Sequence, residues 1–112
     1  MNAQDIINKI VTVTVDRPLG SYHPQYTNLK YLVNYGYIDG VMGGDGEEQD
    51  AYILGVSQPL TKFTGKVIAV IYRENDNETK WIVSPTDKNF TNEEIINLTS
   101  FQEKYFKIRI IR

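Results

Sequence analysis

The stretch from Tyr31 to Gly55 (YLVNYGYIDGVMGGDGEEQDAYILG) constrains the fold of this chain most, because it joins two apolar runs through a short, acidic, glycine-rich turn. Glycines at positions 43, 44 and 46 permit backbone with positive φ and close approach to a ligand. No Lys or Arg occurs between Asp39 and Pro59. Crowded carboxylates repel one another unless they face water or a cation. The turn is therefore either a solvated acidic loop or a site for a hard metal ion.

The composition favours one globular domain over residues 1–112 and excludes several kinds of site. A chain of 112 residues with 41% hydrophobic content can bury a core without cross-links. The absence of cysteine excludes disulfides and thiolate metal sites. A single histidine excludes a His-rich zinc or copper site, so carboxylates are the remaining candidates for metal ligands.

Charge and hydropathy also restrict the partners. With a formal net charge of −2 and no cluster of Lys or Arg, the chain lacks the basic surface that would neutralise a row of phosphates in a nucleic acid. No apolar run approaches the length of a membrane span, and Met1–Ile10 carries Asp5 and Lys9 rather than a signal-peptide pattern. We therefore expect a cytoplasmic protein with no nucleic-acid and no membrane partner.

Short β-forming runs recur along the chain. Val11–Val15 (VTVTV) alternates apolar and hydroxyl side chains, which is typical of a half-buried strand, and Asp16–Ser21 then predicts a turn. Gly65–Arg73 is the most apolar run and predicts a central strand. Further strands are expected at Tyr31–Ile38, Ala51–Val56, Lys80–Val83 and, as a closing edge strand, Lys107–Ile111.

One helix is expected near the C-terminus. Thr91 and Glu94 have the spacing of a capping box, in which each side chain bonds to the backbone N–H of the other residue. The helix that follows would place Ile95, Leu98, Gln102 and Tyr105 on one stripe. Together these elements amount to five or six short strands and one helix. They predict a mainly β fold: a small closed or nearly closed, OB-like β-barrel, taken as five-stranded, with one C-terminal helix.

The acidic turn is the first candidate for chemistry. An extended Asp45-Gly46-Glu47 would put both carboxylates on one face, and Asp50 could rejoin them as the chain enters the next strand. Three convergent oxygens would leave room for the water molecules that Mg²⁺ prefers to keep. A second acidic run follows at Glu74, Asp76 and Glu78, where at most two side chains are expected to face the first cluster. Alternatively, this second acidic run is simply a solvated hairpin tip.

Aromatic residues and histidine supply further candidates. Tyr31, Tyr35 and Tyr37 precede the acids, and their hydroxyls could donate to phosphate oxygens or simply pack in the core. His23 is the only imidazole and lies in an expected loop. Because no Ser or Cys nucleophile accompanies it, we reject a catalytic triad.

These motifs together resemble the soluble class I inorganic pyrophosphatases. Tyr-x-x-Asn-Tyr-Gly-Tyr-Ile begins at Tyr31, and Asp45-Gly46-Glu47-Glu48-Gln49-Asp50 is similar to the family's Asp-x-Asp-Pro-x-Asp. Upstream, Asp16-Arg17-Pro18-Leu19-Gly20-Ser21 resembles Glu-Ile-Pro-x-Gly-Ser. Downstream, Glu78-Thr79-Lys80 resembles Asp-x-Lys, and Phe101–Phe106 resembles a helix that ends in Tyr-Lys. The resemblance runs in order along most of the chain and implies the family's five-stranded barrel.

The resemblance also implies roles for individual residues. Asp45, Asp50 and Glu78 would be Mg²⁺ ligands, with Mn²⁺ as a substitute ion. Glu47 would take a proton from the attacking water, and Asp16 would be a supporting acid. The expected contacts to phosphate are Tyr35, Lys80, Tyr105 and, as a replacement for a basic residue of the family, His23 or Lys30.

The chain departs from the family pattern in several places. Its middle acid, Glu47, is one methylene longer than Asp. Pro24-Gln25-Tyr26 stands where the family has Lys-Tyr-Glu, and the hairpin with a phosphate-binding Arg that follows there is missing. The helical Tyr-Lys reads Tyr105-Phe106, with Lys107 one place later. The metal-binding half of the motif set is therefore better preserved than the phosphate-binding half.

Three functions stay open at this point. The resemblance implies Mg²⁺-dependent hydrolysis of inorganic pyrophosphate to two phosphates, or of another phosphoanhydride. The first alternative is a barrel that binds a divalent ion or phosphate without turnover. The second is an interaction domain with a solvated acidic turn. Homo-oligomerisation is left open as well.

Overall fold

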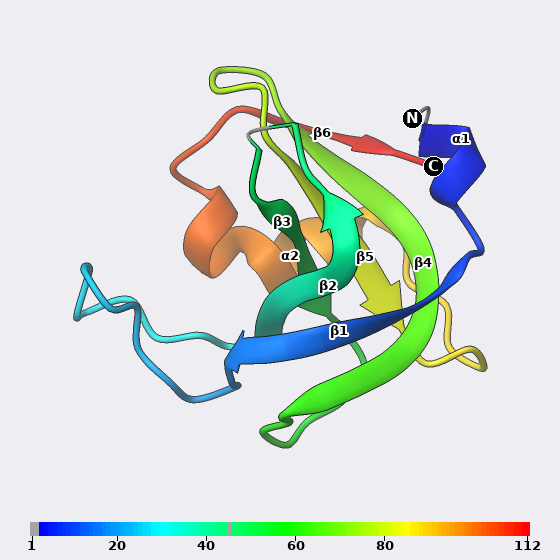
Figure 1. The fold of residues 1–112 in the computed structure, drawn as a ribbon. Helices are drawn as coiled ribbons and strands as arrows, with labels where there is room; N and C mark the ends of the chain where they lie inside the picture. Colours follow the sequence, from blue (N-terminus) through cyan, green and yellow to red (C-terminus); the bar gives the residue numbers. More distant parts are fainter. Residues whose placement is uncertain (1–2, 45) are drawn as a thin grey trace.

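The computed structural model describes residues 3–44 and 46–112 and shows a closed barrel of five strands. The sheet order is β1-β2-β3-β5-β4, and β4 pairs again with β1 to close the barrel, while β6 adds to β4 outside the closure (Figure 1). Among the strand pairs of the described residues, only β3–β5 is parallel. The elements are α1 (Ala3–Ile6), β1 (Ile10–Arg17), β2 (Asn34–Met42), β3 (Glu48–Ile53), β4 (Lys62–Arg73), β5 (Thr79–Ser84), α2 (Asn92–Glu103) and β6 (Ile108–Ile111). The predicted five-stranded barrel with a helix near the C-terminus is confirmed.

The length of β4 explains how one strand can both close the barrel and carry an edge strand. Its first part, Lys62–Lys66, pairs with β1, and its last part, Val70–Arg73, pairs with β6. Its other edge pairs with β5 over most of its length. The apolar run that predicted a central strand is thus the strand on which the barrel closes.

Two apolar layers hold the fold together. The first fills the barrel and draws residues from all five strands, among them Val13, Ile38, Ile53, Val67 and Trp81. The second lies between the outer face of the sheet and α2, and consists of Tyr31, Tyr35, Tyr52, Leu54, Ile71, Ile82 and Ile95 with their neighbours. The alternation of the strands therefore serves two cores, because α2 covers the face that would otherwise meet water.

Glycine is required at one point where β1 pairs with β2. A Cβ on Gly36 would lie 1.9 Å from the carbonyl oxygen of Thr14, which no side chain could tolerate. The backbones of the two strands therefore approach each other closely at Gly36. The register of the β1–β2 pair also shifts between Val15 and Arg17, which is the signature of a β-bulge.

Some boundaries differ from those expected. Asp16 and Arg17 belong to β1 rather than to a turn, and the second strand begins at Asn34 rather than Tyr31. The capping box at Thr91 and Glu94 is present as predicted.

The buried face of α2 was predicted correctly at Ile95 and Gln102 and wrongly at Leu98 and Tyr105. It consists of Ile95, Thr99, Gln102 and Glu103, whereas Leu98 and Tyr105 of the expected stripe are exposed. Polar residues can occupy that face because barrel side chains pair with them, which the helix sequence alone does not reveal.

Candidate active site

Lys80 is the centre of a cluster on the outer face of the barrel. Its Nζ lies 2.6 Å from Oδ2 of Asp50 and 3.2 Å from Oε2 of Glu78, and it donates to Oη of Tyr35 at 3.1 Å. The parallel β3–β5 register pairs Ala51 with Trp81 and so sets Asp50 beside Lys80. Lys80 itself is only 4% exposed. The buried ammonium of Lys80 thus pairs with both Asp50, from the acidic run after the glycine-rich turn, and Glu78, from the later hairpin.

Arg73 forms a second cationic centre close by. Its guanidinium makes two bonds to the buried carboxylate of Glu103, at 2.8 and 2.6 Å, and lies 3.0 Å from Glu78 and 3.6 Å from Asp76. The guanidinium also stacks over Phe106, 3.7 Å from the ring centroid. Burial acts to lower the pKa of Arg73, but the bonds and charge of Glu103 outweigh it and raise that pKa, so the side chain stays protonated.

A chain of hydrogen bonds continues from Glu103 across the inner wall of the site. Tyr52 donates to Glu103 at 2.6 Å, Gln102 donates to Tyr52 at 2.6 Å, and Tyr31 donates to Gln102. Burial raises the pKa of Tyr52 well above its usual value, and the negative charge of Glu103 adds to the effect. Burial and the charge of Asp50 do the same for the pKa of Tyr35. Both tyrosines therefore stay protonated and can donate.

Arg17 completes the cationic surface. It donates to Oη of Tyr31 at 2.6 Å, and its guanidinium carbon lies 5.6 and 5.5 Å from the ring centroids of Tyr31 and Tyr35. The bulge in β1 explains this position, because it turns Arg17 to the outer face, whereas Val15 packs against the core inside the barrel. Among the described residues, no carboxylate forms a salt bridge with Arg17. Of the three buried or half-buried cations here, Arg17 is the one best placed to bind an added anion.

These cations line a cleft of about 850 Å³. The loop between β1 and β2 forms one wall and the C-terminal end of α2 the other, and both project from the same side of the barrel in Figure 1. The floor contains Tyr35, Asp50 and Lys80. The lining includes five Lys or Arg residues and a single acid, Asp50; the cations are Arg17, Lys30, Arg73, Lys80 and Lys104. Such a lining favours an anionic ligand.

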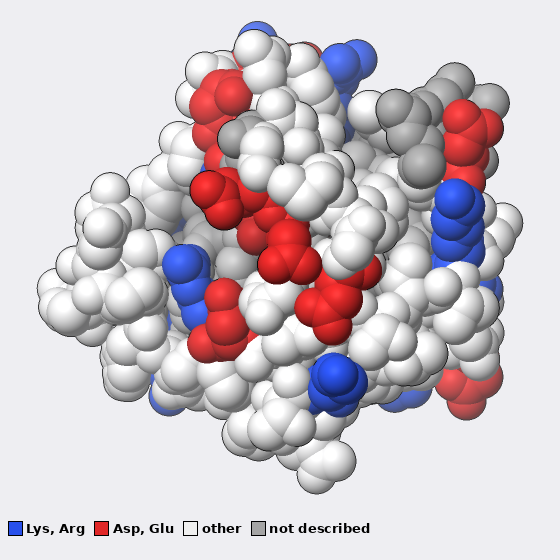
Figure 2. All heavy atoms as spheres, viewed as in Figure 1, with Lys and Arg blue, Asp and Glu red and all other residues white. Residues whose placement is uncertain are grey.

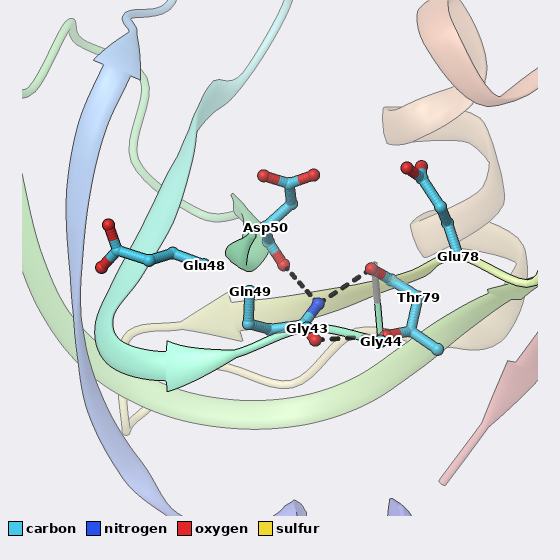
Figure 3. A pocket seen from close by; sticks show the side chains of 7 residues that line it. All are labelled: Gly43, Gly44, Glu48, Gln49, Asp50, Glu78 and Thr79. Atoms are coloured by element: carbon cyan, nitrogen blue, oxygen red, sulfur yellow. Dashed lines mark hydrogen bonds between the residues drawn. The ribbon is translucent and has the colours of Figure 1, made fainter. Parts of the chain in front are cut away.

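Asp50 and Glu78 also line a second, separate hollow. Its volume is about 10 Å³, which is large enough for about one water molecule. Figure 3 shows that the carboxylates of Asp50 and Glu78 point to the same side, whereas Glu48 points away from them. Gln49 donates to the carbonyl oxygens of Asp50 and Thr79, at 3.0 and 2.8 Å, and so ties the start of β3 to the start of β5. Figure 2 shows acidic side chains gathered around this region of the surface.

The fit of a metal ion can be judged from the donor set. Asp50 and Glu78 offer carboxylate oxygens, which suit Mg²⁺, and their side chains are 34% and 32% exposed. Among the described residues, no group of three His, Asp or Glu is close enough to hold a metal ion. Asp45, the remaining expected ligand, lies outside the described residues. The chemistry of the two visible carboxylates fits a hard cation, with Lys80 between them.

The structure places the other expected residues as follows. Glu47 is exposed immediately before β3, and Asp16 is exposed at the bulge of β1. Neighbouring atoms still remove part of the solvent around the Asp16 carboxyl, which raises its pKa. The positive charge of Arg17 acts to lower that pKa, and the negative charge of Asp50 acts to raise it. His23 and Tyr105 line the cleft from its two walls. Tyr35, Asp50, Glu78 and Lys80 are thus in mutual contact or share a partner, whereas Tyr105 and His23 lie further up the walls.

Arg17 and Arg73 were not predicted as site residues from the sequence. The phosphate-binding half of the site was therefore expected to be depleted of cations. Arg17 stood in an expected turn, and Arg73 ended a strand. One feature of the sequence could have identified Arg73: it ends the most apolar run. A cation that is buried at such a position requires a partner of opposite charge.

The family model for inorganic pyrophosphatase matches residues 5–109. The chain belongs to the inorganic pyrophosphatase family. This confirms the resemblance noted in the motifs, and it places the chain among enzymes of the inorganic diphosphatase class.

Solved inorganic pyrophosphatases share the fold of this family member. The protein from Neisseria gonorrhoeae is 20% identical, with a TM-score of 0.65, over 86% of this chain and 73% of that one. The protein from Ehrlichia chaffeensis is 14% identical, with a TM-score of 0.69, over 92% and 85%. The protein from Helicobacter pylori is 16% identical, with a TM-score of 0.65, over 98% and 86%. None of the proteins with curated descriptions matches the chain by sequence.

None of the helices in the described part of this pyrophosphatase-family chain has the length and apolar character needed to cross a membrane.

Proposed function

We propose that this chain hydrolyses inorganic pyrophosphate to two phosphates with Mg²⁺ as its cofactor, for which Mn²⁺ could substitute. The observation that carries the proposal is the Lys80 cluster at the floor of a cation-lined cleft, in a chain of this family. The cluster combines carboxylates for a metal, a buried ammonium and a phenol hydroxyl for phosphate oxygens, which phosphoryl transfer from a phosphoanhydride requires.

The carboxylates would supply the metal ligands and the base. Asp45, Asp50 and Glu78 would hold Mg²⁺, which when bound lowers the pKa of a coordinated water and neutralises charge on the leaving phosphate. Glu47 would accept the proton of the attacking water. Asp16, with its raised pKa, would be a supporting acid at the edge of the site.

The cations and phenols would position the anion. Lys80 donates to Oη of Tyr35, and both residues line the floor of the cleft, where they would donate to the oxygens of a bound phosphate. Arg17 adds a guanidinium whose geometry suits two phosphate oxygens at once. His23 and Tyr105 would contact the substrate from the walls.

The test is release of phosphate from pyrophosphate by the purified, metal-replete chain, with and without Mg²⁺. Asp50→Asn keeps the shape of the side chain but removes its charge, and we expect activity to fall by about a hundredfold or more. Asp87→Asn, an exposed loop change far along the chain, is the matched control and should leave the rate unchanged. No release above the buffer background from wild-type protein would overturn the proposal.

One observation favours the second candidate, a barrel that binds a divalent ion or phosphate without turnover. Asp50 already pairs with Lys80, and Glu78 pairs with both Lys80 and Arg73, so a metal must compete with two cations. Calorimetry that shows Mg²⁺ or pyrophosphate binding without phosphate release would select this candidate. A cytoplasmic location, the absence of nucleic-acid and membrane partners, and homo-oligomerisation stay predictions from the sequence.

A further inference from the structure

The cleft is larger than inorganic pyrophosphate requires. Its volume of about 850 Å³ lies within the range of roughly 300–1,000 Å³ that is typical of pockets for drug-sized ligands. Two linked phosphate groups are far smaller than such a ligand. They would fill the floor around Lys80 and leave the upper part of the cleft to solvent.

Burial separates the lining into two chemically different regions. At the floor, Arg73 and Lys80 are buried and Arg17 is half-buried, and all three are cations. At the rim, Tyr26 is 68% exposed on one wall and Tyr105 is 66% exposed on the other. The floor therefore suits a diphosphate, and the rim offers planar aromatic surface to whatever group the diphosphate carries.

Aromatic contacts connect the rim with the floor along the loop wall. The ring of Tyr26 lies 4.8 Å from that of His23, which stacks at 6.4 Å on Tyr31, the residue that accepts from Arg17. The loop that carries these residues is held by backbone bonds from His23 to Leu29 and from Leu29 to Tyr26. The rim tyrosine is thus fixed relative to the cationic floor, as a built binding surface requires.

We propose that the cleft takes a nucleoside diphosphate, with the diphosphate on Arg17, Arg73 and Lys80 and the base stacked at the rim on Tyr26. The substrate assignment rests on the proposed hydrolytic function. In the reaction, the oxygen of water bonds to the terminal phosphorus and the bond from that phosphorus to the bridging oxygen breaks. The products are a nucleoside monophosphate, inorganic phosphate and one proton released to solvent.

The polar groups at the rim favour a nucleoside over an alkyl group. Asn28, Lys30 and Lys104 line the cleft beside the tyrosines. The ribose hydroxyls and ring nitrogens of a nucleoside can pair with these groups, and stacking on an aromatic side chain suits any base. An alkyl chain would desolvate the same groups without pairing them, which is unfavourable.

The experiment is calorimetry on the full chain in the presence of a chelator, so that binding is measured without turnover. The probes are ADP, inorganic pyrophosphate and an alkyl diphosphate. We expect ADP to bind about tenfold or more tightly than either of the other two, because only ADP engages both regions.

Two variants test the contact with the base. Tyr26→Ala should lower the affinity for ADP relative to that for pyrophosphate by about tenfold, and Tyr26→Phe should restore it, since the ring is what stacks. Tyr22→Ala is the matched control: Tyr22 is an exposed tyrosine of the same loop that does not line the cleft, and its loss should leave the ratio unchanged. Circular dichroism on each variant checks that it is folded.

The outcomes separate this inference from the proposed function. If ADP binds no more tightly than pyrophosphate, or no more tightly than the alkyl diphosphate, the nucleoside assignment is wrong even if pyrophosphate is hydrolysed with Mg²⁺. An unchanged ratio in Tyr26→Ala also overturns it. If ADP binds as expected but no phosphate is released from either anion with Mg²⁺, the binding assignment stands and the hydrolytic function fails.

Discussion

Arg73, the last residue of β4, and Glu103, the last residue of α2, form a two-bond ion pair inside the site wall, with bond lengths of 2.8 and 2.6 Å. The pair connects helix and barrel where they meet at the floor of the cleft. On its far side, Arg73 also holds Glu78, which shares Lys80 with Asp50. The guanidinium of Arg73 therefore both holds α2 against the barrel and positions the carboxylates of the site.

Removal of the buried carboxylate should destabilise the fold strongly. Glu103→Ala leaves Arg73 and Tyr52 without their main partner in the interior, and we expect the free energy of unfolding to fall by about 3–5 kcal/mol in urea denaturation. Asp87→Ala, at an exposed loop position, should change it by no more than about 0.5 kcal/mol. In a double-mutant cycle with Arg73→Met, additive losses would show that the two residues do not act as a pair.

Gly36 should tolerate no side chain. In Gly36→Ala, the new Cβ would meet the Thr14 carbonyl oxygen at 1.9 Å, so β1 and β2 must separate, and we expect a loss of about 2–4 kcal/mol in the free energy of unfolding. Gly44→Ala is a suitable control because, apart from its two chain neighbours, no described residue has an atom within 4 Å of the Cβ position there. Equal midpoints for the two variants in thermal denaturation would contradict the close approach of β1 and β2 at Gly36.

Lys80 should matter more for binding than its neighbours on the surface. In Lys80→Met, the carboxylates of Asp50 and Glu78 lose the ammonium between them, and the floor of the cleft loses a buried positive charge. We expect phosphate release from pyrophosphate to fall by about a hundredfold or more, and the thermal shift caused by pyrophosphate to disappear. Lys62→Met, at an exposed position of β4, should retain both. A variant at position 80 with the thermal shift intact would place the anion elsewhere.

His23 should make stability depend on pH in mildly acidic solution. Desolvation and the nearby charge of Arg17 lower the pKa of His23 below its ordinary value of 6.5, and Nδ1 accepts from the backbone N–H groups of Gln25 and Tyr26 in its unprotonated form. As the pH falls below about 6.5, the unfolded chain binds a proton before the folded chain does, so stability is lost. Above that pH both states are neutral and the contribution is constant.

The measurement is the midpoint of thermal unfolding at pH 7.5 and pH 5, compared with that of His23→Ala. We expect the wild-type midpoint to decline more than that of the variant between these two pH values. A decline that is the same in both proteins would show that the Nδ1 bonds make no difference to stability in this range.

Local patterns in the sequence predict the strands and the helix start with their physical reasons. Three of these patterns depend only on neighbouring residues: the alternation in Val11–Val15, the apolar run of Gly65–Arg73 and the capping box at Thr91. The structure contains the two strands and the capped helix that they predict. A glycine inside a strand indicates a bulge or a close backbone approach, and the structure shows the close approach at Gly36. The succession of short strands also predicted a small barrel, and the family motifs implied its five-stranded form.

The tertiary structure decided which charges meet. The parallel register of β3 and β5 brings Asp50 to Lys80, 30 residues later in the chain. A single bulge turns Arg17 away from the side that strand alternation assigns to it and toward Tyr31 and Tyr35. The polar face of α2 is buried because Arg73 and Tyr52 pair with Glu103. A sequence specifies the periodicity of each element, but the partner of a buried charge is set by register and packing between distant elements. For that reason, the contribution of Arg17 and Arg73 to the floor of the cleft became visible only in the folded chain.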